Sequence, residues 1–460
     1  MTGLKSSKYN FLLDADDGTH LLYNAISCGF AKLDNASYPE VQKLLADPNN
    51  YQVDTPEKVK LLESAKQARY IMDEDMNELE ILKLRSNVAR FRTDSLHLTI
   101  MPTLQCNFRC SYCYENPNQG KMSKEIQRGL VLWVKEKMKT LKSMDISWFG
   151  GEPLLAFDVM KRLTYGIKKY CQKEKVDFSA TITTNGYLMG EKVITEFKNL
   201  GITSVQVSID GPPDIHDKRR ILRSGKGTYD RIIDNLLVLI TLMKDVEIVI
   251  RVNCDNLSFN NIPEMFDILP DQIRERSQIY FRQVFPPPPP EWGGKQLESR
   301  QAAEENVKIC LPELFTKAQK HRFVVYLPYF VPRVAYCEAD TYSHYVVDPQ
   351  GNLHKCTVGF SPEKRVGYIT PKGEAVMNVS DLARWLSKDP FSMEVCRECK
   401  ILPLCLGGCD FSHFCARGES KKCHSVVDPM WLEENLKILY RNFCLKNGKE
   451  QLQRNNRSSV

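Results

Sequence analysis

Three cysteines spaced CxxxCxxC form the most informative motif of this 460-residue chain. Cys106, Cys110 and Cys113 follow the apolar stretch 96–101, so they occupy a loop directly after a predicted strand. Three thiolates on one loop can hold three irons of a [4Fe-4S] cube, whose usual ligand set is four cysteines. The next cysteine along the chain is Cys171, so the motif predicts a cluster with one iron open to a ligand that is not protein. A structural zinc site is the competing interpretation, but zinc sites prefer cysteine pairs completed to four ligands, and no second pair is close in sequence.

Polar loops that contain glycine follow the next predicted strands. The run Gly150-Gly151-Glu152-Pro153 comes directly after the second strand, and paired glycines let backbone groups approach a ligand closely. The carboxylate of Glu152 can receive a protonated amine. The later loops supply hydroxyl, amide and cationic groups suited to a ribose and a carboxylate, at Asn185, Ser208, Asp210, His216, Arg219 and Arg220. Four such loops in order predict one shared polar site.

The elements that must position these loops alternate between short apolar strands and amphipathic helices, a pattern typical of a parallel sheet with helical crossovers. We therefore predict the α/β class. A helix is expected over 124–141, between the first two strands. Six strands suit an incomplete, TIM-like (β/α)6 barrel, in which the loops at the carboxyl ends of the strands carry the chemistry. The strands are expected at 97–101, 145–148, 179–183, 204–209, 246–252 and 279–285.

The cysteine motif and the four ordered loops, within 96–284, resemble the radical S-adenosylmethionine (SAM) superfamily. The resemblance implies a [4Fe-4S] cluster on the three cysteines that chelates the methionine amine and carboxylate of SAM at its open iron. One electron from a flavodoxin- or ferredoxin-type donor would cleave the sulfonium and leave a 5′-deoxyadenosyl radical, which abstracts a substrate hydrogen. The cofactor contacts that it implies are Tyr112 near the adenine, Gly150–Pro153 at the amino group, and Asn185, Ser208 and Arg220 at the carboxylate or ribose.

A second cysteine-rich region extends to Cys423. Its spacing, C-x13-G-x4-C and then C-x2-C-x5-C-x3-C…C, resembles the SPASM extension, which carries two auxiliary [4Fe-4S] clusters. The resemblance implies that Cys337, Cys356 and Cys409 hold the first auxiliary cluster. It implies that the second is held by Cys396, Cys399, Cys405 and Cys423.

Three assignments in this region stay open. The fourth iron of the first auxiliary cluster is either held by Cys310 or open to a substrate thiolate. Cys415 could replace Cys423 as a ligand of the second cluster. A zinc ribbon is the competing interpretation, because the pair Cys396 and Cys399 alone would permit one.

The first 90 residues predict a small α+β module. Apolar segments at 9–13 and 19–24 flank the turn at 14–18, which is a hairpin pattern, and helix-period segments follow at 38–46 and 55–70. The module resembles the winged-helix-like RiPP recognition element, which binds the leader of a ribosomal precursor peptide. Such a leader would add a strand to the hairpin edge. An extension that only caps the barrel is the alternative.

Composition and a run of prolines divide the chain further. The prolines at 286–290 cannot continue a strand ladder or a helix, so they indicate a stiff connector. We predict a recognition module at 1–92, the radical SAM barrel at 93–290 and a connecting helical segment at 291–330. A cysteine-rich auxiliary-cluster domain at 331–430 and a final helix with a disordered tail at 431–460 complete the division.

The overall composition is that of an ordinary globular protein, with 42% apolar and 26% charged residues. The net charge of +6 arises partly from the tail 446–457, so no nucleic-acid surface is expected. The first residues lack an apolar signal segment and no stretch is long enough to span a bilayer, so neither a membrane nor secretion is expected. Sixteen cysteines in a chain expected in the reducing cytoplasm favour metal ligation over disulfides.

We therefore expect an oxidoreductase-type peptide maturase that installs a thioether or carbon–carbon cross-link in a ribosomal precursor peptide. The alternative is an anaerobic sulfatase-maturing enzyme, which makes formylglycine. Thr357 stands where that family has an aspartate base, and this counts against the alternative. A non-catalytic iron–sulfur electron carrier or zinc-binding protein would not need the amine and ribose loops. The sequence identifies neither the bond formed nor the catalytic base.

Overall fold

The computed structural model describes residues 3–113, 115, 120–255, 258–284, 311–325, 330–358, 364–415 and 431–444. The chain divides into two compact units, which we treat separately. The sheet unit comprises Arg92–Tyr326 and Thr341–Leu386, and the terminal unit comprises Met1–Phe91, Leu327–Asp340 and Ser387–Val460.

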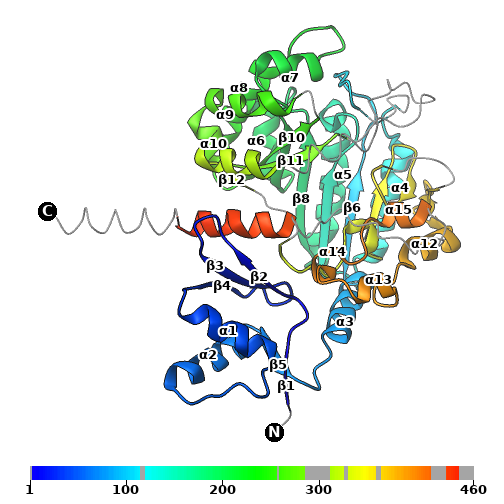
Figure 1. Ribbon diagram of the computed structural model, residues 1–460. Helices are drawn as coiled ribbons and strands as arrows, with labels where there is room; N and C mark the ends of the chain where they lie inside the picture. The colour runs from blue at the N-terminus through cyan, green and yellow to red at the C-terminus, as the bar shows by residue number, and fades with distance from the viewer. Residues whose placement is uncertain are drawn as a thin grey trace. The chain divides into compact units, whose positions relative to one another are not determined.

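An 11-stranded sheet organises the sheet unit, in the order β12-β11-β10-β9-β8-β7-β6-β13-β14-β15-β16. All neighbours from β12 to β13 pair in parallel, and β13 to β16 pair antiparallel. In Figure 1 the central strands progress from blue-cyan to green along the chain. The strands are β6 Ser95–Ile100, β7 Ser143–Trp148, β8 Asp177–Thr184, β9 Ile202–Ser208, β10 Glu247–Cys254, β11 Ser277–Gln283, β12 Val324–Val325, β13 His344–Val347, β14 Asn352–His354, β15 Gly367–Ile369 and β16 Ala375–Met377.

The six strands expected from the sequence correspond to β6 to β11, which confirms the α/β class and the parallel sheet. The sheet extends beyond those six, because β13 adds to β6 in parallel with His344 opposite His97. The short segments β12 to β16 were not predicted. They contain few residues each, so they carry little periodic signal.

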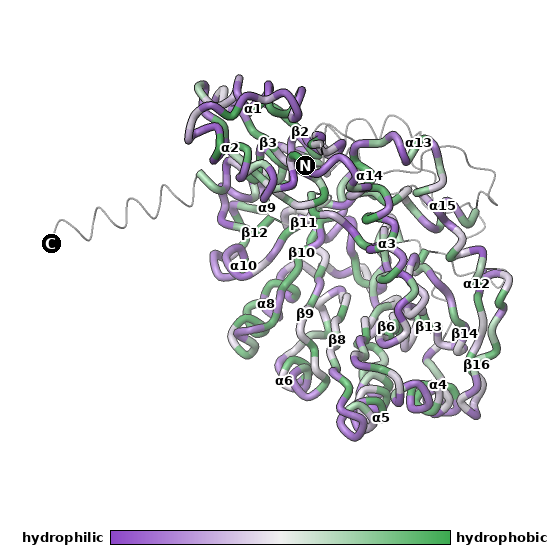
Figure 2. Tube along the Cα trace, turned by 90° about the horizontal axis from the view of Figure 1, so that it is seen from below, coloured by the Kyte–Doolittle hydropathy of each residue, from purple (hydrophilic) through white to green (hydrophobic). Residues whose placement is uncertain are grey.

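Helices connect the parallel strands and cover one face of the sheet. Figure 2 shows α8, α6, α5 and α4 along one side of the strands. The segment α4 corresponds to the helix expected at 124–141 but ends at Lys137. Its N-cap is Ser123, whose side chain accepts a hydrogen bond from the backbone N–H of Ile126. The helices are α4 Lys124–Lys137, α5 Phe157–Glu174, α6 Glu191–Asn199, α7 Pro213–Arg219, α8 Tyr229–Leu242, α9 Ile262–Ile268, α10 Asp271–Arg276 and α12 Val379–Leu386, with short 3-10 turns at Pro153–Ala156 and Phe259–Asn261.

The two faces of the sheet differ in polarity because successive side chains of a strand alternate. Leu98, Ile100, Ile146 and Trp148 are almost completely buried in the hydrophobic core. Between them, His97 on β6 hydrogen-bonds to Ser147 on β7, with 2.8 Å between Nε2 and Oγ. The polar side chains therefore occupy the face opposite the apolar one.

The terminal unit contains a three-stranded antiparallel sheet in the order β2-β3-β4 and a two-stranded sheet of β1 and β5. The hairpin expected at 9–24 is β2 and β3, and the expected helices are α1 and α2. The elements are β1 Leu4–Ser6, β2 Asn10–Asp14, β3 His20–Asn24, β4 Phe30–Leu33, α1 Ser37–Ala46, α2 Pro56–Gln67, β5 Ile71–Asp73, α3 Glu78–Arg90, a 3-10 turn Glu338–Asp340, α13 Glu394–Arg397, α14 Leu402–Cys405 and α15 Asp410–Cys415. A helix also covers 431–444, as expected.

The core of the terminal unit contains residues from both the N-terminal and the C-terminal part of the chain. Tyr9 and Tyr23 from the N-terminal sheet, Leu82 from α3, and Cys396 and Cys405 from the cysteine-rich segment belong to one buried cluster. The compact units therefore follow spatial contact rather than sequence order, and the five-part division made from the sequence stays a prediction. So do the winged-helix character of the N-terminal module and a separate auxiliary-cluster domain.

Several expectations lie outside the described residues, namely those for the proline run 286–290, Cys310 and Cys423. No helix in the described ranges is both long enough and apolar enough to cross a membrane.

Candidate functional site

The three cysteines lie on the loop that leaves the carboxyl end of β6. The backbone turns tightly there, because the N–H of Cys113 donates to the carbonyl of Cys110 at 3.2 Å, and the N–H of Phe108 donates to Cys106 Sγ at 3.4 Å. Burial raises the pKa of the Cys106 and Cys113 thiols to about 12. Free thiols would stay protonated at neutral pH, so they become thiolate ligands only when a cation binds.

The segment after α7 pairs with one side of this loop. Residues 107–111 run antiparallel to 219–223, with a bridge between Phe108 and Leu222. The N–H of Arg109 donates to the carbonyl of Ile221 at 2.8 Å, and the N–H of Arg223 donates to the carbonyl of Asn107 at 2.9 Å. The two segments are separated by about 110 residues in sequence, so their pairing is a tertiary feature that the sequence pattern did not reveal.

The glycine run after β7 packs against the other side, at the entry to the loop. A Cβ at Gly151 would lie 2.3 Å from the carbonyl oxygen of Leu104 and 2.4 Å from that of Gln105. The N–H of Glu152 donates to the carbonyl of Gln105 at 2.9 Å. Gly150 adopts a φ of +117°, a backbone conformation that favours glycine. The close approach that the glycines permit is thus to the cysteine loop itself.

The carboxylate of Glu152 organises the next loop. It is fully buried, and it accepts hydrogen bonds from the N–H of Leu154 at 3.0 Å, the hydroxyl of Thr184 at 2.8 Å and the N–H of Asn185 at 2.7 Å. Asn185 in turn donates from Nδ2 to Asn107 Oδ1 at 2.8 Å and lies 3.9 Å from Cys106 Sγ. Because N–H donors to cluster sulfurs tune the reduction potential, Asn185 is placed to influence a cluster on Cys106.

Tyr112 is held by side chains from the ends of β9 and β10. Its hydroxyl donates to Asp210 and accepts from Arg220 Nη1 at 2.6 Å and from Asn253 Nδ2 at 3.0 Å. The guanidinium of Arg219 lies 5.3 Å from the centre of the Tyr112 ring. Arg219 is itself paired with Asp255 at 2.6 Å. The network fixes the aromatic side chain between the second and third cysteines.

Asn253 and Asp255 were not predicted as site residues. Both follow or end a strand in a short polar run, which is the only signal that could have marked them. Of the predicted residues, Cys106, Tyr112, Glu152, Asn185 and Arg220 are brought together. Pro153 begins a 3-10 turn, and Ser208 ends β9 with no hydrogen bond from its side chain to these groups in the described part of the chain.

Four buried polar atoms at the site have no hydrogen-bond partner among the described residues: Asn107 Nδ2, Glu115 Oε2, Arg219 Nε and Arg220 Nε. Three are donors, and the fourth belongs to the carboxyl group of Glu115, whose pKa burial raises to about 8. Unpaired buried polar groups are costly, so they indicate a missing partner. A zwitterion with one ammonium and one carboxylate has the complementary groups, and three cysteines are the donor set for three irons. The residues present therefore fit an iron–sulfur cluster and the amino acid part of SAM.

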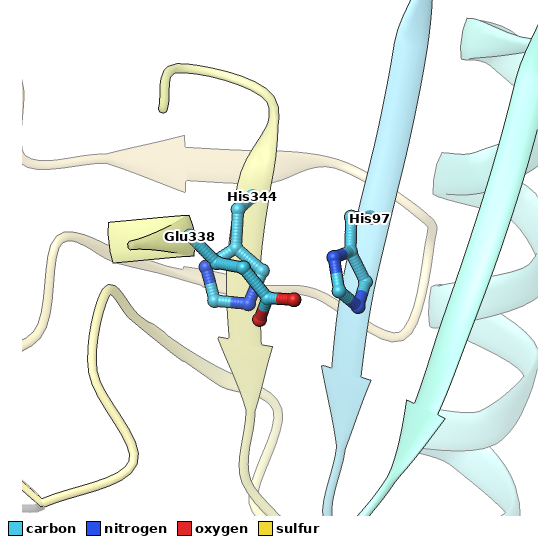
Figure 3. Close-up of side chains that lie close together, drawn as sticks. All are labelled: His97, Glu338 and His344. Carbon is cyan, nitrogen blue, oxygen red and sulfur yellow. The ribbon is translucent and has the colours of Figure 1, made fainter. Parts of the chain in front are cut away.

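The polar face of the sheet continues from the site along β6. Figure 3 shows His97 on β6 beside His344 on the neighbouring β13, with 5.0 Å between the ring centres. His344 Nε2 lies 3.1 Å from the hydroxyl of Thr99 in a hydrogen bond. Burial lowers the pKa of His344 well below its usual range, which keeps this ring neutral.

The cysteines of the second region are divided between the units, since Cys356 belongs to the sheet unit and the others that are described belong to the terminal unit. In the terminal unit, Cys337 Sγ donates to Asp410 Oδ2 at 3.5 Å. Lys388, only 2% exposed, pairs with Asp410 at 2.7 Å and lies 3.6 Å from Asp340. A buried ion-pair cluster therefore fixes the segments next to Cys337 and Cys409.

Residues 100–257 match the family model of the radical SAM superfamily. The chain is 24% identical over 340 residues to the cysteine-type anaerobic sulfatase-maturating enzyme of Clostridium novyi (strain NT), a match that covers 68% of this chain and 88% of that protein. It is 22% identical over 303 residues to the radical SAM cyclopropyl synthase TigE of Paramaledivibacter caminithermalis, which covers 60% of each.

The fold is also similar to a solved structure, native anSMEcpe with bound AdoMet and the Kp18Cys peptide. The TM-score is 0.56 at 20% identity, and the superposition covers 76% of this chain and 97% of that one. The family match includes the cysteine loop, the glycine run, Asn185 and Arg220. Residues 100–257 are therefore a radical SAM domain.

Proposed function

We propose that this protein is a radical SAM peptide maturase that cross-links a ribosomal precursor peptide. The observation that carries the proposal is that the glycine run, Asn185 and the segment 219–223 all contact the cysteine loop. Beside this loop, buried polar atoms without a hydrogen-bond partner could bind the ammonium and carboxylate groups of a zwitterion. Sixteen cysteines suit a reducing compartment, so we propose that the protein is located in the cytoplasm.

The residues of this site would have distinct roles in binding the cluster and SAM. Cys106, Cys110 and Cys113 would hold the cluster, and Asn185 would donate toward its sulfur. Glu115 would accept the ammonium of SAM, and Arg220 would donate to its carboxylate while it also holds the Tyr112 hydroxyl. When bound, the reduced cluster and SAM supply a radical that abstracts hydrogen from the substrate. Ser208 and Gly150 remain proposed contacts of the ribose and the amino group.

We also propose two auxiliary clusters, with the ligands that the SPASM resemblance implies. The support within the terminal unit is that Cys337 and the Cys409–Asp410 pair are joined through one hydrogen bond. Cys396 and Cys405 are almost fully buried in a shared core, which would shield a cluster from water. The iron that lacks a cysteine ligand in the first auxiliary cluster would bind a substrate thiolate.

The proposal of a peptide substrate is supported by the N-terminal sheet and by the similar proteins. In the order β2-β3-β4, β4 is an edge strand. The N–H of Asn24 donates to the carbonyl of Gly29, and hydrogen-bonded pairs alternate along an antiparallel ladder. In β4, the backbone N–H and C=O groups of Phe30 and Lys32 therefore point away from β3. These outward groups suit the addition of a leader peptide as a further strand.

A backbone variant tests leader binding in the full-length chain. Deletion of residues 1–90 would also expose the core around Cys396, so it is a poor test. Lys32→Pro removes one outward N–H and keeps the ladder to β3, as prolines on edge strands do. Lys32→Ala removes the side chain and keeps the N–H. We expect Lys32→Pro to weaken leader binding about fivefold or more, since one edge hydrogen bond, worth about 1 kcal/mol, is lost. Equal affinities of the two variants would contradict leader addition at β4.

The second candidate is a sulfatase-maturing enzyme, which the Clostridium novyi relative favours. About a third of this chain lies outside that match, and Thr357 lacks the carboxylate of the expected base. Incubation of the reduced holoenzyme with any short, cysteine- or aromatic-rich peptide that a neighbouring reading frame encodes, and separately with a sulfatase peptide, discriminates between them. Loss of two hydrogens without a free aldehyde in the first peptide supports cross-linking. A hydrazide-reactive aldehyde in the sulfatase peptide supports the second candidate.

A further inference from the structure

The segment that pairs with the cysteine loop ends in a tight turn. The N–H of Leu222 donates to the carbonyl of Lys226 at 3.1 Å, and Gly225 has a φ of +83°. Through the bridge between Phe108 and Leu222, this turn is fixed directly to the loop that carries the three cysteines. Figure 1 shows α7, which leads into the turn, at the same end of the sheet as the segment that follows β6.

The cationic side chains of this segment fall into an inner and an outer group. Arg219 and Arg220 are directed inward and are bound by Asp255 and Tyr112. The outer group consists of exposed side chains on the turn and on the cysteine loop itself, at Arg109, Lys218, Arg223 and Lys226.

Carboxylates neutralise only one member of this outer group among the described residues. Asp217 is used internally, since it accepts the N–H groups of Thr228 and Tyr229 at the start of α8. Lys218 lies 3.8 Å from Asp214, and in the described ranges Arg109, Arg223 and Lys226 form no ion pair. We call these four residues the outer basic surface.

We propose that the outer basic surface is the docking site of an acidic one-electron carrier protein, an inference that rests on the proposed function. The reduced carrier loses one electron, and the cluster on Cys106, Cys110 and Cys113 gains it. No bond forms or breaks, and no proton moves.

Position and charge both support this occupant. Electron transfer weakens steeply with distance, and this surface belongs to the two segments that are hydrogen-bonded around the cysteines. Redox encounters use small interfaces, so one turn and one loop provide enough area. A patch with a net positive charge accelerates association with an oppositely charged partner by about 10- to 1,000-fold at low salt.

A second basic patch of the sheet unit provides a matched control. Lys168, Lys169 and Lys198 line a shallow pocket between α5 and α6. They lie near the C-terminal ends of these helices, which lead into the amino ends of β8 and β9, so they are at the opposite edge of the sheet from the cysteine loop.

The experiment compares reduction rates of the reconstituted holoenzyme by stopped-flow absorbance. The test variant is Arg223→Glu/Lys226→Glu, and the control, which reverses the same number of charges, is Lys169→Glu/Lys198→Glu. Each is reduced by prereduced flavodoxin as the acidic carrier and, separately, by photoreduced 5-deazariboflavin, a small neutral reductant. Iron content shows that the variants retain their clusters. A milder variant, Arg223→Gln/Lys226→Gln, guards against loss of folding.

We expect the test variant to slow reduction by flavodoxin at least about tenfold at low ionic strength, and the difference to vanish in about 1 M salt. The glutamine variant should show a smaller decrease, and the control variant should match the wild type. Reduction by deazariboflavin should be unchanged throughout. Unchanged reduction by flavodoxin in the test variant, or an equal decrease in the control, would overturn the docking assignment. A holoenzyme that accepts electrons but does not cleave SAM would refute the proposed function and leave this assignment intact.

Discussion

Gly151→Ala is the substitution whose effect the structure specifies best. Its Cβ would lie 2.3 Å and 2.4 Å from two carbonyl oxygens of the segment that enters the cysteine loop. Ordinary contact is about 3.5 Å, so the overlap exceeds about 1 Å. The obstructing atoms belong to the backbone, which cannot rotate away as a side chain could.

The magnitude follows from what must move. Overpacking of this kind costs about 1–3 kcal/mol. Separation of the two segments would also weaken the hydrogen bonds from Gly151 to Thr103, at 3.3 Å, and from Glu152 to Gln105, at 2.9 Å. Each is worth about 1 kcal/mol. We expect a loss of about 3 kcal/mol, which lowers the melting temperature by about 6 °C for a unit of this size.

The assay combines thermal unfolding with iron content after anaerobic reconstitution. Gly120→Ala is the matched control, because no atom lies within 4 Å of its Cβ, and we expect it to change stability by less than about 0.5 kcal/mol. Gly151→Ala should bind less iron as well as melt earlier, since Gln105 is adjacent to Cys106. If both glycine variants melt alike and hold the same iron, the packing argument for the glycine run is wrong.

Three further predictions concern buried groups. Tyr112→Phe should cost about 3 kcal/mol in thermal unfolding because it leaves buried polar partners unsatisfied, whereas Tyr165→Phe, at an exposed hydroxyl, should cost less than about 0.5 kcal/mol. Burial lowers the pKa of His216 to about 4, so the unfolded state binds more protons between pH 6.5 and 4. The wild type should therefore lose about 3 kcal/mol more than His216→Gln over that range in urea titrations, and a parallel pH dependence would contradict this. Lys388→Met should destabilise the protein by about 3–5 kcal/mol, and Lys388→Met/Asp410→Asn should recover part of this loss; no recovery would argue against the buried pair.

The parallel strands were predictable because their apolar runs are long and their spacing is regular. β6 to β11 each contain at least two buried apolar residues, and β6 to β10 are each followed by a polar loop or a helix. β13 was not predictable as a neighbour of β6, because about 250 residues separate His97 from His344, and strand register depends on tertiary packing. The shared core of Tyr9 and Cys405 was hidden for the same reason.

The sequence predicted which residues belong to the candidate site better than it predicted their hydrogen-bond partners. The spacing of the three cysteines and the order of the loops indicated which residues belong together. Their partners depend on the direction of individual side chains, which no sequence pattern specifies. Arg220 was expected at a cofactor carboxylate, and it also holds Tyr112. Glu152 was expected to bind an amine, yet its carboxylate already accepts three hydrogen bonds from the neighbouring loops.

The most direct test of the central claim is reductive cleavage of SAM by the reconstituted protein. The wild type, reduced anaerobically with SAM present, should produce 5′-deoxyadenosine, and Cys106→Ala should produce none. Cys171→Ala is the matched control, since this buried thiol lies in α5, and it should behave as the wild type. Production of 5′-deoxyadenosine by Cys106→Ala at the rate of the wild type, or its absence from a wild type that holds a reducible cluster, would contradict the account.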